Sequence, residues 1–334
     1  MKKFLSLLLT LILGVCAMSM VGCGSEKITV YTGGTGGTYY AFTNGLVTQL
    51  RQKTPYTYNV VGDTGGSVAN LKAIGKGDCK MAIVQNDTMV NAYNGLTDNF
   101  ASGAITNFSV IGQVYPEVVQ IVTNDPEIQT LADLVGSNKR VSIGDVGSGV
   151  EANAVALLRK YGVNIERNGN SYTSTDIIIQ NLSVANSANA MKDGNLEVFF
   201  FTSGAPATSI SELAVTNTIY MLGLSDAVIN EFIADNKIDN QYDVYSKQPI
   251  TNAQYSFIPA GQTVYTIGVS ATYIVSNSLS EDVVYNITKA IWESKGSIGH
   301  SVESTMNTAT ATITIGNVPV HAGAQRYYNE IANS

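Results

Sequence analysis

The residues best suited to chemistry in this sequence are glycines and hydroxyl residues at three junctions between an apolar run and a helix-like pattern. These junctions cover residues 33–39, 145–151 and 202–207. The first N–H groups of a helix lack intrahelical partners and carry the positive end of the helix dipole. Glycine lets a ligand approach such groups closely. The junctions therefore predict sites for a small anionic or strongly polar molecule.

The glycine spacing does not match the common nucleotide-binding motifs. The sequence contains no G-x-x-x-x-G-K-[ST], and Tyr39 stands where a G-x-G-x-x-G fingerprint beginning at Gly34 needs its last glycine. An ordinary strand-to-helix turn is the plain alternative for any single junction. Because the same arrangement occurs three times, we favour ligand binding.

The N-terminus has the features of an export signal. Two lysines at 2–3 precede an apolar run over residues 4–20, and Gly22 then precedes Cys23. This order predicts a lipoprotein signal peptide over residues 1–22 and lipidation of Cys23. We therefore expect an exported chain, anchored by lipid to the outer face of the bacterial cytoplasmic membrane or periplasmic. An uncleaved N-terminal transmembrane helix is the alternative.

The composition limits the possible functions. The chain has 26 acidic and 19 basic residues, a formal net charge of −7, which becomes about −9 once the signal is removed. This acidity argues against binding nucleic acid or a polybasic contact with membranes. Cys79 is left without an internal disulfide partner. His300 and His321 lack the spacing of a zinc site, so we expect no metal and no cofactor.

Strand-like and helix-like patterns alternate along almost the whole chain. The clearest amphipathic helix covers residues 281–292. This alternation predicts an α/β fold with mainly parallel sheets. Pro116 is expected to separate a strand at 108–115 from another at 118–123. In open α/β sheets ligands lie beyond the carboxyl ends of the strands, so the three glycine-rich junctions would face one cleft.

The mature chain, roughly 310 residues, is long enough for two lobes rather than one core. We predict the first part of lobe 1 at residues 23–118 and lobe 2 at 119–222. A return segment with the C-terminal helices, residues 223–334, would complete lobe 1.

Motifs spread in order over nearly the whole mature chain resemble a known family. They lie at residues 32–40, 66–71, 81–87, 115–117, 131–134, 141–144, 147–154, 199–200, 204–206, 281–285 and 321–328. In these motifs the chain resembles the TAXI-type solute-binding proteins of TRAP transporters. The resemblance implies a two-lobed, periplasmic-binding-protein-like fold of type II with a ligand cleft between the lobes. It also implies that the protein captures a ligand and is not an enzyme.

The implied function is that of an extracytoplasmic solute receptor. Such a receptor captures a small anionic or zwitterionic solute (glutamate, glutamine or a related dicarboxylate) and delivers it to a TRAP-type membrane permease. The implied partners are the solute, the permease subunits and, through its lipid, the membrane; we expect a monomer. Asn86 and Val150 stand where the family usually has serine and threonine. Both lie where ligand contacts are expected, so the identity of the solute stays open.

The expected ligand-binding residues come from the glycine-rich junctions and the motifs beside them. They are Gly36, Gly37, Thr38, Tyr39, Gln85, Asn86, Asp87, Tyr115, Ser148, Gly149, Val150, Glu151, Gly204, Ala205 and Pro206. Amides and hydroxyls at the helix starts would hold a carboxylate, and Asp87 would pair with an ammonium group. Structural roles stay open for Tyr39 in packing, for Asp87 as a helix cap and for Glu151 near a helix start. Pro206 is expected at the first position of a helix.

Two other functions stay open. Ser148 in a Gly-Ser-Gly turn could serve an exported serine hydrolase that recruits His321 and Asp87, although the G-x-S-x-G elbow is absent. A sensory lipoprotein could use the same fold.

Arginine is absent from the three junctions, so neutral donors and helix ends would have to bind an anion.

Overall fold

A computed structural model describes residues 26–238 and 242–333, and the predicted signal peptide and Cys23 lie outside them. The strands are β1 (Lys27–Tyr31), β2 (Thr57–Val61), β3 (Met81–Gln85), β4 (Phe108–Thr123), β5 (Arg140–Ser142), β6 (Glu166–Asn168), β7 (Ser171–Thr173), β8 (Ile178–Gln180), β9 (Val198–Ser203), β10 (Tyr220–Leu222), β11 (Ser246–Thr251) and β12 (Thr263–Ser276). The α-helices are α2 (Thr38–Lys53), α3 (Ser67–Lys76), α4 (Asn86–Asn94), α5 (Thr97–Phe100), α6 (Gly149–Lys160), α7 (Val184–Lys192), α8 (Thr208–Thr216), α9 (Asp226–Asp235), α10 (Glu281–Trp292) and α11 (Ala322–Ala332). Short 3-10 helices cover Leu131–Leu134, Ser301–Thr305 and Thr308–Thr310.

One mixed sheet organises the described residues. Its strand order is β2-β1-β3-β12-β4-β9-β5-β8, with β10 beside β4 and β11 beside β12. At one end β1 runs parallel to β2 and β3, and at the other end β5 runs parallel to β8 and β9. The two long central strands, β4 and β12, pair antiparallel with each other and with their other neighbours. The α/β prediction is confirmed, but the expectation of mainly parallel sheets is wrong at the centre of the sheet.

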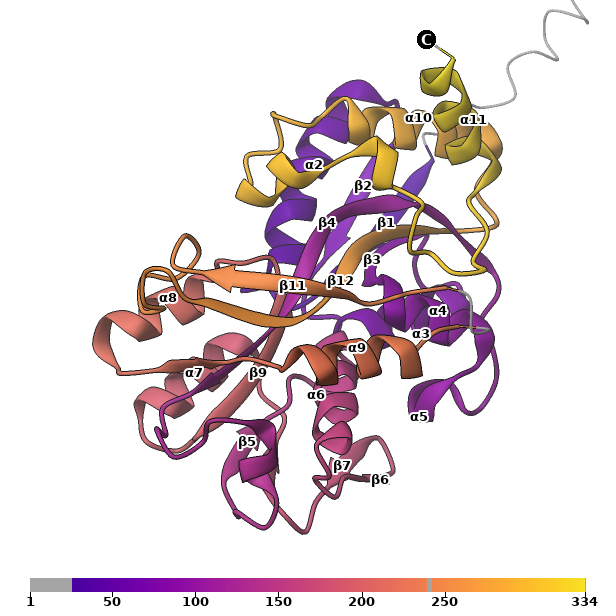
Figure 1. The fold of residues 1–334 in the computed structure, drawn as a ribbon. Coiled ribbons are helices and arrows are strands. Elements are labelled where there is room, and N and C mark those ends of the chain that lie inside the picture. The colour runs from indigo at the N-terminus through magenta and orange to yellow at the C-terminus, as the bar shows by residue number, and fades with distance from the viewer. Residues whose placement is uncertain (1–25, 239–241, 334) are drawn as a thin grey trace, which may run out of the picture.

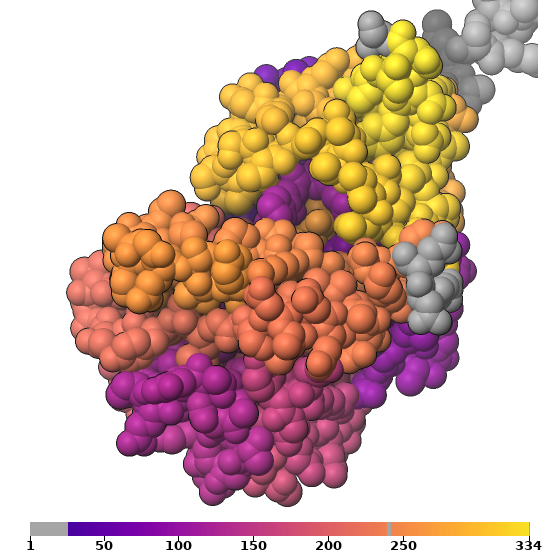
Figure 2. Space-filling model, in the orientation of Figure 1, coloured from indigo at the N-terminus to yellow at the C-terminus, as the bar shows by residue number. Residues whose placement is uncertain are grey.

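The two central strands also connect the two halves of the molecule. In Figure 1, α2, α10 and α11 pack around the end of the sheet that β1 and β2 form, whereas α6, α7 and α8 lie around β5 and β9. On the face shown in Figure 2, the surface is hollowed between the yellow C-terminal segment and the orange segment that carries α9 and β11. This arrangement has two lobes on a shared sheet. The exact residue limits of the lobes stay a prediction.

Pro116 lies inside β4 instead of ending a strand. Its partner in the antiparallel register is Ser270 of β12. The Ser270 N–H donates to Asn86 Oδ1 (2.7 Å), and the Ser270 carbonyl accepts from the Thr272 hydroxyl (3.1 Å). Since side chains satisfy the partner's backbone groups, β4 tolerates a residue that cannot donate to the ladder. The predicted break at Pro116 is therefore wrong.

Burial of apolar side chains follows the expected periodicity. Helix α10 begins and ends where predicted, and it buries Val284, Ile287 and Ile291 against α2 and the sheet. A second cluster contains buried apolar residues of α3, α4 and α6 together with residues of the sheet on which these helices pack. A third joins α7, α8 and β9 to Ile250 and Tyr255. Within the ranges described above, no helix is long and apolar enough to span a bilayer.

Candidate functional site

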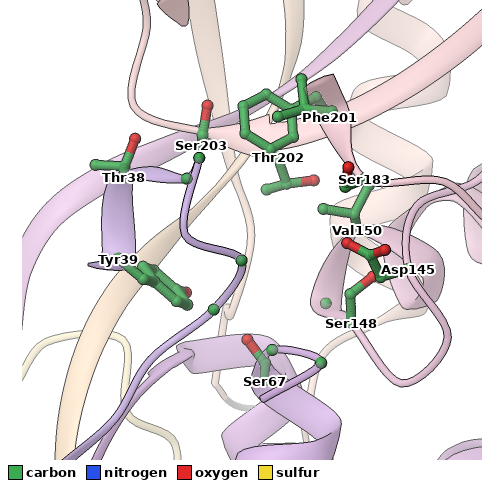
Figure 3. Close-up of a pocket in the computed structure, with 18 of the residues that line it drawn as sticks. Thr38, Tyr39, Ser67, Asp145, Ser148, Val150, Ser183, Phe201, Thr202 and Ser203 are labelled. Atoms are coloured by element: carbon green, nitrogen blue, oxygen red, sulfur yellow. The ribbon is translucent and has the colours of Figure 1, made fainter. Parts of the chain in front are cut away.

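A cavity of about 210 Å³ lies where several helices begin between the two halves of the sheet. It is lined by residues 33–39, 63, 65–67, 85, 117, 145, 148–150, 183–185 and 201–203. Figure 3 shows Thr38 and Tyr39 on one side of this space and Asp145, Ser148 and Ser183 on the opposite side. The volume lies below the range usual for drug-sized ligands, so the cavity suits a small metabolite.

Four helix N-termini contribute backbone donors to the cavity. Helix α2 begins after Gly37 and α3 after Gly66, and no described side chain caps either helix. Helices α6 and α7 begin after Ser148 and Ser183, whose hydroxyls accept from the N–H groups three residues on (3.0 and 3.3 Å). The converging helix starts produce a positive potential and leave free N–H groups, which together favour a carboxylate.

The start of α3, with the glycine before it, contacts the loop before α6 beside the cavity. The Ala69 N–H donates to the Gly147 carbonyl (3.1 Å). Gly66 has a φ of +100°, and a Cβ there would lie 3.3 Å from Ser148 Cα. A residue with a side chain at position 66 would therefore strain the backbone and press on the opposite loop. The segments predicted to belong to different lobes are thus in direct contact here.

Position 149 is equally restricted. A Cβ on Gly149 would collide with the side-chain amide of Gln85, which is 2% exposed and comes from the end of β3. Gly36, by contrast, faces open space, because no described heavy atom lies within 4 Å of the place that its Cβ would take. Gly149 thus allows close packing against Gln85, whereas Gly36 leaves space beside the cavity.

The floor of the cavity carries a buried carboxyl group. Glu117 is 2% exposed, and its Oε2 accepts a hydrogen bond from the Tyr39 hydroxyl (2.7 Å). Burial raises the pKa of Glu117 to about 8, so this side chain is mostly neutral at pH 7. Two nearby buried atoms, Gln85 Oε1 and the Tyr115 hydroxyl oxygen, have no hydrogen-bond partner among the described residues. A buried polar atom without a partner is unfavourable, so these two oxygens favour an occupant that can donate hydrogen bonds to them.

Two more carboxyl groups lie on the walls. Asp63 accepts from the Thr35 N–H (2.9 Å). Burial, followed by the charge of Asp63, raises the pKa of Asp145. No lysine, arginine or histidine occurs among the described lining residues. The cavity therefore offers backbone donors to an anionic group and carboxyl acceptors to a cationic group.

Eight of the residues predicted to bind a ligand line this cavity. They are Gly36, Gly37, Thr38, Tyr39, Gln85, Ser148, Gly149 and Val150. The structure places Asn86, Asp87, Tyr115, Glu151, Gly204, Ala205 and Pro206 outside its lining.

Asn86 and Glu151 support the loops behind the cavity. Besides Ser270, Asn86 bonds the carbonyls of Val244 and Thr314 through its Nδ2 (2.9 Å each). Glu151 accepts from the Gly147 N–H (2.9 Å) and from Asn181 Nδ2 (3.0 Å). Both side chains have their polar groups occupied by the protein, which favours the structural role that was left open for Glu151.

Asp87 belongs to a buried network that reaches the cavity wall. One of its oxygens accepts from the Tyr245 hydroxyl and from Asn153 Nδ2 (2.7 Å each). Asn153 Oδ1 in turn accepts from the hydroxyl of Thr202, which lines the cavity (3.0 Å). Burial raises the pKa of Asp87 in spite of these donors. The network joins α4, α6 and β9, so Asp87 positions the wall from behind.

Asp87→Ala should lower the free energy of unfolding by about 3 kcal/mol, because two buried donors lose their acceptor. Urea unfolding at pH 7 measures this loss. The matched control is Asp98→Asn, which breaks a surface ion pair with Arg159 (3.0 Å) and should cost about 0.5 kcal/mol or less. Equal losses in the two variants would contradict the role of the Asp87 network.

The junction at 204–206 lies beside the cavity. Pro206 lines an adjoining groove of about 180 Å³ that shares residues 35–38 and Phe201 with the cavity. A Cβ on Gly204 would lie 2.7 Å from Val302 Cγ1, so this glycine permits close packing. The expectation that Pro206 takes the first helical position is wrong. The Ala207 N–H donates to the Tyr255 hydroxyl (2.6 Å), and α8 begins only at Thr208.

The three residues considered for a hydrolase have separate structural roles. The Ser148 hydroxyl caps α6, and His321 Nδ1 accepts from the Gly323 N–H (3.2 Å) to cap α11. Asp87 is bonded to Tyr245 and Asn153 as described above. Of the three, Ser148 alone lines the cavity within the described part of the chain. This arrangement lacks the serine–histidine contact that such a mechanism requires.

Sequence analysis missed several lining residues for which a signal existed. Glu117 stood in the Tyr-Pro-Glu motif of the family resemblance but was not selected. Ser67 follows two glycines at a further strand-to-helix junction, and Ser183 has the sequence signature of a helix cap. Asp145 lies at the edge of a predicted junction. Phe201 to Ser203 end an apolar strand, where ligand contacts are expected in this class of fold.

Comparison with known proteins agrees with this architecture. MatC from Rhodopseudomonas palustris, solved with bound malate, matches with a TM-score of 0.54 and 12% identity over 93% of this chain and 98% of that chain. A protein of Bordetella bronchiseptica RB50 matches with a TM-score of 0.53 and 13% identity over 92% and 82%. At these identities the likeness shows the fold alone, which is the two-lobed binding-protein fold of type II. The profile of the NMT1-like family matches residues 30–331. This chain therefore belongs to the NMT1-like family, whose members are extracytoplasmic, periplasmic solute-binding proteins.

Proposed function

We propose that this protein is a receptor that captures a small zwitterionic amino acid and releases it unaltered to a membrane permease. The observation that carries the proposal is the composition of the cavity. Four helix starts supply donors for a carboxylate, and Asp63, Glu117 and Asp145 supply acceptors for an ammonium group. A zwitterion presents both charges on neighbouring atoms, so it satisfies both sets of groups at once.

Among the solutes considered from the sequence, glutamine fits this cavity better than glutamate or a dicarboxylate such as 2-oxoglutarate. A second carboxylate would share the cavity with the acidic side chains of Asp63 and Asp145, and no described lining residue carries a guanidinium or ammonium group to offset the repulsion. The side-chain amide of glutamine avoids this repulsion and still offers hydrogen-bond donors.

The membrane partner follows from the sequence resemblance. We propose that the receptor is of the TAXI type, that it serves a TRAP-type permease, and that a lipid on Cys23 holds it at the membrane. Metabolic labelling with a palmitate analogue tests the lipid, with Cys23→Ala as the variant that should lose the label. Solute uptake in vesicles that contain the purified permease and this receptor tests the pairing. Uptake that does not depend on the receptor would contradict it.

Binding by the purified mature chain is measured most simply as a shift in melting temperature. Glutamine at about 100 times its Kd should stabilise the protein by about 2.7 kcal/mol. For a chain of this size, such a gain raises the melting temperature by about 4 °C. Equal or greater stabilisation by 2-oxoglutarate would contradict the proposed ligand class, and turnover of glutamine would contradict a receptor.

Gly36→Val should abolish the shift while leaving the fold intact. Gly36 lines the cavity, and no described heavy atom lies within 4 Å of the place that a new Cβ would take, so the branched side chain would add bulk at the cavity's edge without a clash. The matched control is Ala41→Val, which adds comparable bulk to an exposed position of α2 that lines only the adjoining groove. A normal shift in Gly36→Val would place the ligand elsewhere.

A further inference from the structure

Of the three carboxyl groups in the cavity, Glu117 differs from the others in depth and in its neighbours. It is 2% exposed, whereas Asp145 is half-buried and Asp63 lies at the exposed rim. It has no described cationic partner, although a buried carboxyl group normally needs one in order to ionise. Glu117 is therefore the carboxyl group that would gain most from a cationic group of the ligand.

We propose that Glu117 and Gln85 form the subsite for the ligand's ammonium group, and that the ammonium enters by displacing a proton from Glu117. This inference rests on the proposed function and deepens it. It names the residues that recognise the cationic end of the ligand and the proton that leaves. Sequence analysis assigned the ammonium contact to Asp87, which lies outside the cavity lining.

The geometry supports this assignment because two acceptors on the floor lack donors. Tyr39 occupies one oxygen of Glu117, and no described residue donates to the other. Gln85 Oε1 is buried and likewise unpartnered. The two side chains come from β3 and β4, the strands on either side of β12, and both line the cavity. An ammonium group has three donors and no acceptor, so it matches a part of the cavity that offers acceptors without donors.

The charges around Glu117 also favour an ammonium group as its partner. The groups that face it are the hydroxyls of Tyr39 and Tyr115, whose pKa values burial raises, and the carboxylate of Asp87, which opposes ionisation of Glu117. None of these groups supplies a positive charge. In the empty cavity Glu117 therefore keeps its proton, since burial raises its pKa to about 8. A bound ammonium supplies the missing charge, Glu117 ionises, and one proton passes to the solvent for each ligand bound.

Calorimetric titration of glutamine into the purified mature chain tests this proton balance. Titrations at pH 7.0 in phosphate and in Tris, buffers with different ionisation enthalpies, give the number of protons released. We expect close to one proton per ligand from the unmodified chain. Glu117→Gln should release none and bind about 10- to 100-fold more weakly, since it loses a charge-assisted hydrogen bond. Asp145→Asn should weaken binding but keep the released proton.

A second probe isolates the ammonium group itself. Glutaramate is glutamine without its α-ammonium, so it should bind the unmodified chain and Glu117→Gln with equal affinity and without proton release. Glu127→Gln, a change at an exposed residue outside the cavity lining, serves as the control with unchanged glutamine binding.

The outcomes separate this inference from the proposed function. If glutamine binds the unmodified chain without proton release, or binds Glu117→Gln equally well, the inference is overturned while the receptor function stands. Loss of the proton in Asp145→Asn but not in Glu117→Gln would assign the subsite to Asp145 instead. If no amino acid binds the unmodified chain, both the inference and the proposed function fail.

Discussion

Gly149→Ala should lower the affinity for the amino acid by about 100-fold. The added methyl group would collide with the buried amide of Gln85, whose Nε2 would lie 2.8 Å from the new Cβ. Gln85 must then leave the floor of the cavity, or α6 must move away from it. Either change separates the backbone donors of α6 from the acceptors on β3 and β4.

A double-mutant cycle shows whether this collision is the cause. Gln85→Ala removes the amide and makes room for the methyl group, so adding Gly149→Ala to it should cost about fivefold or less in affinity. Calorimetry on the four proteins of the cycle measures the coupling. If Gly149→Ala costs the same with and without Gln85, the packing of α6 against this side chain does not control binding.

Glu117→Gln should raise the free energy of unfolding of the unliganded protein by about 4 kcal/mol at pH 7.5. The folded state raises the pKa of Glu117 to about 8, whereas an unfolded glutamate titrates near 4.3. The neutral form therefore stabilises the fold fully below about pH 4.3. This contribution is lost as the pH rises towards 8 and is absent above it. Glutamine cannot ionise, so the variant keeps its stability over this range.

Urea unfolding of the unliganded proteins between pH 5 and 8.5 measures this difference. Asp87, Asp145 and Glu151 also have raised pKa values and give both proteins a slope of the same sign. The informative quantity is thus the difference between the free energies of unfolding of Glu117→Gln and of the unmodified chain. This difference should grow with pH and become constant above pH 8. Parallel curves would show that Glu117 is not buried in its neutral form. The amino acid, at one concentration well above both Kd values, should narrow the difference between the two proteins by about 1.4 to 2.7 kcal/mol, because Glu117→Gln binds about 10- to 100-fold more weakly.

Much of the fold could be predicted from local sequence patterns. Helix α10 followed from its periodicity, and two of the three predicted junctions contain helix starts that line the cavity, those of α2 and α6. The centre of the sheet could not be predicted in this way. Pro116 looked like a strand end because its tolerance depends on Asn86 and Thr272, which are distant in sequence or belong to another strand. Antiparallel pairing of β4 with β12 is likewise a long-range property.

The site was predictable where backbone atoms form it and less so where side chains do. Glycines and hydroxyl residues at helix starts indicated the donors around Gly37 and Ser148 directly. Asp87 and Glu117 are both acidic residues that follow or lie within β-strand motifs, and no local pattern separates them. Their surroundings do, since Asp87 is enclosed by Tyr245 and Asn153 whereas Glu117 faces the cavity. Only the packing of three distant segments could make that distinction.

A crystal structure of the mature chain grown with glutamine tests the central claim most directly. We expect unaltered glutamine in the cavity, with its carboxylate about 3 Å from N–H groups at the starts of α2 or α6. Its ammonium group should lie within hydrogen-bond distance of Glu117 and Gln85. An occupied cavity with the carboxylate turned towards Glu117, or a ligand bound only outside the helix starts, would contradict the account.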